Sequence, residues 1–194
     1  RHGSIGQRQK RSTVSPRWFA TWISKTARPV AGRSGRRAFC RRATIFVVVD
    51  HCTSECLGLH ATARGNRFEA LEPVHQAVTE VFGGVDEKIA AGVLLRHDHG
   101  SVYTSEFQRE IRFLGLESSS AFVRAPEGNG CAERFIRTLK EQLLWLRFFP
   151  AVAELNAALA DFRGRYNHRW RLERHDYRAP AEVRAAFMAL ETAA

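Results

Sequence analysis

The sequence predicts one layered α/β domain, because strand-like and helix-like segments alternate along most of its length. Residues 43–50 (ATIFVVVD) form a β-branched apolar run of strand length. Residues 55–61 supply a second strand, which can pair with the first as an antiparallel hairpin. Residues 66–82 place apolar side chains at helical spacing and end at Gly83, and residues 93–98 form another buried type of strand.

The second half of the chain continues this alternation. Ser105 and Gln108 predict a capping box at the start of a short helix that ends near Gly115. The elements expected after it are a strand at 116–122, a glycine-containing loop at 124–130, an amphipathic helix to about 146, and helices near 151–166 and 181–190.

The charge distribution divides the chain into two parts. The net charge is +10, yet all 20 Asp and Glu residues lie at or after Asp50. Residues 1–42 are rich in Arg, Ser, Gly and Thr and show no helical or strand period, so they are predicted to be an irregular basic segment. Residues 43–190 are predicted to be the folded core with a basic helical tail. A basic arm normally indicates a nucleic-acid partner.

Several classes of protein are excluded by composition. The four cysteines show no paired spacing, which predicts reduced thiols and no disulfide framework. No apolar run reaches the ~18 residues that a membrane span requires. The basic N-terminal residues are not followed by an apolar stretch typical of a secretory signal. A cytoplasmic protein with no membrane partner is expected.

Two segments carry the chemistry. Residues 97–105 (HDHGSVYTS) contain Asp98 at the end of a predicted strand, and residues 127–141 (EGNGCAERFIRTLKE) contain Glu133 near the start of a helix. The first resembles the D-[NH]-G-[ST]-x-[YF]-x-S segment of the integrase core in insertion-sequence transposases of bacterial type. The second resembles that family's N-[GA]-x-x-E-x-x-[FN]-x-x-[LI]-K signature. The 34 residues between Asp98 and Glu133 match the family's spacing.

The resemblance covers about residues 43–187 and implies the RNase H-like fold of the DDE transposases and retroviral integrases. It implies cleavage of DNA at element ends and strand transfer to target DNA, with two Mg²⁺ (or Mn²⁺) ions. Asp98 and Glu133 would be the catalytic metal ligands, because hard cations bind carboxylate oxygens. The family also implies a homo-oligomer that acts on DNA at the nucleoid.

The helix after the glycine loop suits such a role. Glu133, Arg137 and Lys140 fall at i, i+4 and i+7, so they share one face. A carboxylate near the helix start with two cations further along fits a metal ion at one end and DNA phosphates along the side. Asn129, from the same signature, is a further candidate for DNA contact.

Residues 163–178 interleave arginines with aromatic residues. Arg169 and Arg171 are candidate phosphate contacts, and the aromatic rings could stack on bases. The alternative is a solvated helix end with Trp170 packed into the core, and the sequence favours neither.

The family pattern breaks near the N-terminus. The family carries its first catalytic aspartate in a W-x-T-D segment, and the best local match is residues 18–22 (WFATW), where Trp22 replaces the acid. Asp50 is the remaining candidate for a third carboxylate. The predicted cause is an out-of-frame or unrelated sequence in residues 1–42, and the predicted consequence is a first strand that is missing or irregular. Strand transfer is therefore expected to be weak or absent, and the alternatives are a catalytically inactive DNA-binding remnant of a transposase or an RNase H-like nuclease.

Overall fold

The computed structural model describes residues 19–27, 43–97, 100–120 and 130–193, and its centre is a five-stranded mixed sheet. The strand order is β3-β2-β1-β4-β5. Pairing is antiparallel between β1 and β2 and between β2 and β3, and parallel between β1 and β4 and between β4 and β5. The strands are β1 (Phe19–Ala27), β2 (Ala43–Asp50), β3 (Cys56–Thr62), β4 (Leu94–His97) and β5 (Glu117–Ser120).

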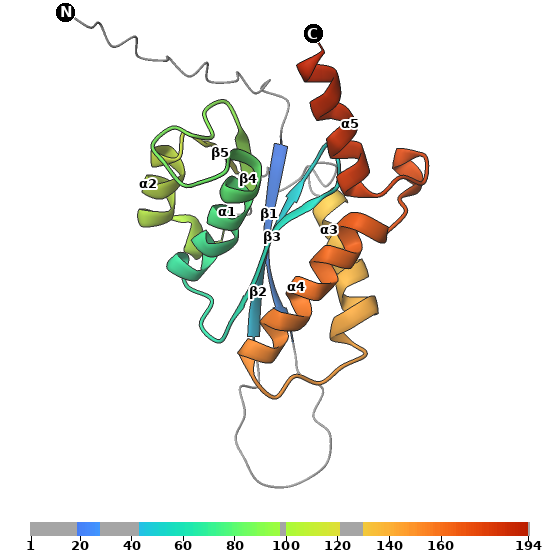
Figure 1. Cartoon of the computed structure of the whole chain (residues 1–194). Helices are drawn as coiled ribbons and strands as arrows, with labels where there is room; N and C mark the ends of the chain where they lie inside the picture. The colour runs from blue at the N-terminus through green and yellow to red at the C-terminus, as the bar shows by residue number, and fades with distance from the viewer. Residues whose placement is uncertain (1–18, 28–42, 98–99, 121–129, 194) are drawn as a thin grey trace, which may run out of the picture.

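Helices cover both faces of the sheet, α1 and α2 on one side and α3 and α4 on the other (Figure 1). The helices are α1 (Arg67–Phe82), α2 (Glu106–Phe113), α3 (Gly130–Leu139), α4 (Val152–Arg169) and α5 (Pro180–Thr192). A π-helical turn, Lys140–Leu144, extends α3. The predicted α/β class is confirmed, as is the order of the elements from residue 43 onward. None of the described helices is long and apolar enough to cross a membrane.

β2 is apolar between Thr44 and Asp50, as suits a strand with both faces buried. Phe46 and Val48 pack against α1 and α2, whereas Val47 and Val49 pack against α3 and α4. Successive side chains of a strand point to opposite faces, so one strand supplies both halves of the core. This strand is the apolar run 43–50 that the sequence predicted.

The first strand differs from the sequence-based expectation. In place of a missing or irregular strand, β1 lies at the centre of the sheet and pairs with both β2 and β4. Its sequence, FATWISKTA, is rich in aromatic, β-branched and threonine residues, which suit a pleated strand. Backbone pairing with β2 requires no acidic residue, so the lack of an aspartate in this segment does not prevent a strand. Whether residues 1–42 are read in frame stays a prediction.

The helix ends are partly as expected. Asn66 caps α1, since its side-chain oxygen accepts hydrogen bonds from the backbone N–H groups of Phe68 (2.9 Å) and Glu69 (3.0 Å). Gly83 ends α1 with a φ of 82°. The capping box expected at Ser105 is wrong, because the Ser105 side chain makes no capping hydrogen bond. Gln108 instead donates to the Tyr103 carbonyl at 3.0 Å.

Candidate functional site

The C-terminal end of β4 is fixed by the side chain of His97. Its Nε2 lies 2.9 Å from Ser118 Oγ on β5 and 3.2 Å from Gln108 Nε2 on α2. Its ring lies 4.9 Å from the Tyr103 ring, centroid to centroid. His97 is therefore a buried structural residue that joins β4, β5 and α2. Asp98 directly follows it, and Asp98 and His99 lie outside the described residues.

The register of β1 against β4 bears on the first catalytic position. Thr21 pairs with Arg96 in the parallel ladder, so Trp22 stands one residue further along β1, level with His97. Trp22 is thus in the sheet's central strand, level with the end of β4 that leads to Asp98. Tryptophan offers no oxygen ligand, so this position cannot supply a carboxylate to a hard cation.

Glu133 lies in the first turn of α3, and its side chain is exposed. The predicted two-sided character of this helix is confirmed, because Phe135 and Leu139 are buried on the opposite side. Arg137 and Lys140 continue the face of Glu133. Arg137 Nε forms an exposed i,i+4 ion pair with Glu141 at 3.2 Å, which contributes little to stability.

Asp50 is the last residue of β2, and its side chain is hydrogen-bonded within the turn that follows. Only 1% of its surface is exposed. One carboxylate oxygen accepts hydrogen bonds from Thr53 N–H (2.8 Å) and Thr53 Oγ1 (2.6 Å), and the other lies 3.4 Å from the donor Cys52 N. Burial raises the pKa of Asp50, although these hydrogen bonds act in the opposite direction. These contacts speak against the suggested third metal ligand.

The register separates Asp50 from the β4 end as well. Asp50 pairs with Ala20, and Ala20 pairs with Leu95. Asp50 therefore stands at the level of Leu95, three residues before Asp98, and on the far side of β1. Neighbouring strands lie ~4.8 Å apart and each residue adds ~3.3 Å along a strand, so the backbone of Asp50 and the end of β4 are on the order of 10 Å apart.

The described part of the chain does not complete a metal site. It contains no group of three or more His, Cys, Asp or Glu side chains arranged to hold a metal ion. Glu133 offers one accessible carboxylate, Asp98 lies outside the described residues, and Trp22 and Asp50 are unsuited for the reasons given above. Among the candidate residues that the structure describes, Glu133 alone offers an accessible carboxylate, against the three carboxylates of the DDE pattern.

In the basic segment 163–178, some side chains pack into the core and others are exposed to solvent. Tyr166 is buried against Phe135, with ring centroids 4.8 Å apart, and Trp170 stacks on Tyr166 at 6.3 Å. These rings belong to the core, as the alternative interpretation of the sequence proposed. Arg171 forms an ion pair with Glu182, whereas Arg169 at the end of α4 is exposed. Asn129 lies outside the described residues.

A pocket of about 320 Å³, the α3 pocket, opens at the N-terminal end of α3. It lies between the turn after β2, the start of α3, and the segment after α4. Its lining residues are Ser54, Gly130, Cys131, Arg134, Tyr166, Leu172 and Arg174. Arg174 and Tyr166 belong to the stretch 163–178 that the sequence offered as a possible DNA contact. The other lining residues were not singled out, although Cys131 and Arg134 flank Glu133.

A buried hydrogen-bonded chain closes one wall of the α3 pocket. The Cys131 thiol lies 3.4 Å from Ser54 Oγ, which lies 3.3 Å from His175 Nε2. Burial raises the pKa of Cys131 and lowers the pKa of His175. At neutral pH this wall is therefore uncharged.

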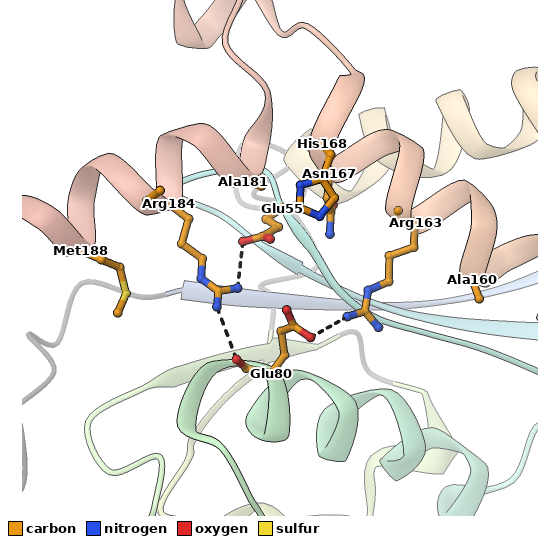
Figure 2. Close-up of a pocket in the computed structure, with 11 residues that line it drawn as sticks. Glu55, Glu80, Ala160, Arg163, Asn167, His168, Ala181, Arg184 and Met188 are labelled. Atoms are coloured by element: carbon orange, nitrogen blue, oxygen red, sulfur yellow. Dashed lines mark hydrogen bonds and ion pairs between the residues drawn. The ribbon is translucent and has the colours of Figure 1, made fainter.

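A second pocket of about 610 Å³, the α5 pocket, lies between α1, α4 and α5. Figure 2 shows Arg184 of α5 reaching the Glu55 carboxylate at 3.1 Å and the Glu80 backbone oxygen at 3.4 Å. Arg163 of α4 contacts the Glu80 carboxylate at 3.1 Å. These arginines are neutralised within the chain, and they connect α5 and α4 to the rest of the core.

Comparison with known proteins agrees with this architecture. Residues 114–180 match the family described as the integrase core domain. The resemblance to transposase and integrase cores is confirmed.

Among sequence relatives are InsD of insertion element IS2E from Escherichia coli strain K12 and the transposase InsD of insertion element IS2D from the same strain. Each is 32% identical over 144 residues, or 73% of this chain. The chain spans 65% of the first relative and 47% of the second.

Solved structures share the fold at low sequence identity. The catalytic core domain of BIV integrase aligns with a TM-score of 0.58 at 15% identity, covering 89% of this chain and 97% of that one. A pre-cleavage Mos1 transpososome gives a TM-score of 0.55 at 12% identity, covering 77% of this chain and 49% of that one. The predicted RNase H-like fold is therefore confirmed.

Proposed function

We propose that this chain is the core of an insertion-sequence transposase that binds DNA and whose strand cleavage and strand transfer are impaired. The observation that carries the proposal is the accessible Glu133, placed in the first turn of α3 with Arg137 and Lys140 on the same face. This helix lies on an RNase H-like sheet in a chain whose relatives include transposases. A homo-oligomer on chromosomal DNA is part of the proposal.

Divalent metal is the expected cofactor. Asp98 and Glu133 would hold Mg²⁺ or Mn²⁺, which in phosphoryl transfer activates the attacking oxygen and stabilises the leaving one. Trp22 stands level with the β4 end and provides no third carboxylate. The predicted consequence is weak metal retention and slow cleavage.

Arg137, Lys140 and Arg169 are proposed to contact DNA phosphates, and Asn129 stays a further candidate for DNA contact. Their cationic side chains are suited to sequence-independent, salt-dependent affinity. Arg171 and Arg137 are weaker candidates, because Glu182 and Glu141 form ion pairs with them. DNA binding of this kind does not require the metal site.

The test separates binding from cleavage. The whole chain, Asp98→Asn and Glu133→Gln are compared for binding to a labelled duplex and for Mg²⁺- and Mn²⁺-dependent nicking of supercoiled plasmid. We expect binding to change less than about twofold, because neither acid attracts phosphate. Any nicking by the unmodified chain should fall at least about a hundredfold in each variant. An unchanged nicking rate in both variants would contradict the assignment of these acids.

The second candidate function is a DNA-binding remnant without catalysis. The position of Trp22 favours it specifically, since a two-carboxylate site is incomplete. The same experiment distinguishes the two: DNA binding with no metal-dependent nicking in any of the proteins identifies the remnant. Joining of a labelled end to a second duplex, as opposed to hydrolysis alone, separates a transposase from a nuclease.

A further inference from the structure

The α3 pocket is formed by three parts of the chain that are distant in sequence. Ser54 comes from the turn after β2, Cys131 and Arg134 come from α3, and Arg174 comes from the segment after α4. Its volume of about 320 Å³ corresponds to roughly ten water molecules, so it admits a small polar group with its solvent.

Two guanidinium groups meet at this pocket. Among the described residues, neither Arg134 nor Arg174 has a carboxylate within ion-pair distance. Arg174 makes one long hydrogen bond, 3.4 Å, to the backbone oxygen of His51. Both arginines act on the same two groups, since each lowers the pKa of the Cys131 thiol and of the Tyr166 hydroxyl against the larger effect of burial. The two positive charges therefore converge on one space.

The other titratable groups near the pocket do not cancel this charge. Asp50 raises the pKa of the Cys131 thiol, but this acid is buried, and its carboxylate is hydrogen-bonded within the turn that follows it. The pKa values of His51 and His175 are lowered, first by burial and then by Arg174. Both imidazoles are therefore neutral at pH 7, and the pocket mouth is cationic.

We propose that the α3 pocket binds a phosphate group of the DNA backbone between Arg134 and Arg174. Guanidinium groups present several N–H donors in a planar fork that matches phosphate oxygens, and two of them from different segments can hold one phosphate from two sides. Arg134 directly follows Glu133, so a phosphate held here would fix the DNA strand next to the proposed catalytic face of α3. This inference rests on the proposed function for the identity of the ligand as DNA.

The experiment measures DNA affinity of the whole chain against salt concentration. Binding of a labelled duplex is followed by fluorescence anisotropy between about 50 and 200 mM NaCl. The variants are the double substitution Arg134→Ala/Arg174→Ala and the charge-retaining Arg134→Lys/Arg174→Lys. Arg109→Ala is the matched control, because Arg109 is an exposed arginine on α2, on the opposite side of the sheet.

The alanine double variant should bind about tenfold more weakly, and its slope of log K against log salt should be smaller by about 0.9, the value for one phosphate contact. The lysine double variant should keep the slope and lose part of the affinity, which also shows that the pocket folds without arginine. Arg109→Ala should match the unmodified chain. Equal slopes and affinities for the unmodified chain and the alanine double variant overturn the proposal.

Two further measurements identify the source of the phosphate and distinguish a failure of this proposal from a failure of the proposed function. If inorganic phosphate raises the melting temperature of the unmodified chain but not of the alanine variant, while DNA affinity is equal in both, the pocket is a free-anion site and the DNA proposal is wrong. If the unmodified chain binds no DNA, the proposal is also overturned. If Glu133→Gln nicks normally but the alanine variant shows the lower slope, the catalytic assignment fails and the pocket proposal stands.

Discussion

The two pockets use the same residue type in opposite ways. In the α5 pocket, Arg184 and Arg163 are paired with Glu55 and Glu80, and the Glu55 side chain is only 6% exposed. In the α3 pocket, two arginines converge with no carboxylate partner among the described residues. The first set of contacts joins helices to the core, whereas the second leaves positive charge available to a ligand.

The role of a basic side chain therefore depends more on its partners in the fold than on the number of arginines in its segment. The sequence shows an arginine-rich stretch at 163–178 without indicating which members are paired. Only the fold brings Glu80 to Arg163, which is 83 positions away along the chain. Paired and unpaired arginines should therefore differ in what they contribute to the stability and to the function of the protein.

The largest effect is expected from breaking the best-buried ion pair. Glu55→Ala leaves the partly buried Arg184 without its carboxylate, so the free energy of unfolding should fall by about 3 kcal/mol. Urea denaturation at pH 7 measures it. Glu80→Ala is the matched control: 46% of the Glu80 side chain is exposed, so its loss should cost less than about 1 kcal/mol. Equal losses for the two variants would contradict the distinction.

The two arginines of the α3 pocket are expected to contribute little to the stability of the protein. Arg134→Ala and Arg174→Ala remove exposed side chains without ion-pair partners among the described residues, so each should change the free energy of unfolding by no more than about 0.5 kcal/mol. The same denaturation experiment checks both. A loss as large as that of Glu55→Ala would show that these arginines are structural, and would remove the contrast between the pockets.

A smaller, pH-dependent effect is expected at Asp50. Burial raises its folded-state pKa above the unfolded value, so its contribution is fully present below pH ~4 and is lost as the pH rises through the folded pKa. The free energy of unfolding should fall over this window by about 1.4 kcal/mol per unit of pKa difference, and Asp50→Asn should remove that part of the dependence. Denaturation of the unmodified chain and of Asp50→Asn at pH 4 and pH 7 measures this fall. An equal change in the free energy of unfolding of both proteins would contradict the prediction.

Much of the fold followed from periodicity. The run 43–50 and the spacing in 66–82 predicted β2 and α1 within a residue, and the signature around Glu133 predicted an exposed acid on an otherwise core-facing helix. β1 was missed because a strand-compatible composition does not by itself reveal pairing with β2 and β4, and the segment lies within a basic stretch. The role of Asp50 was missed for a related reason, since a strand-end acid looks alike whether it faces a metal or caps its own turn.

The proposed function rests on a site that is one carboxylate short of a working DDE centre. Its most direct test is Trp22→Asp, because the β1–β4 register sets this position level with the end of β4. We predict that Trp22→Asp raises Mn²⁺-dependent plasmid nicking at least about tenfold over the unmodified chain, and that adding Glu133→Gln removes the gain. Nicking that stays unchanged in a folded Trp22→Asp variant, or a gain that survives Glu133→Gln, would contradict the account.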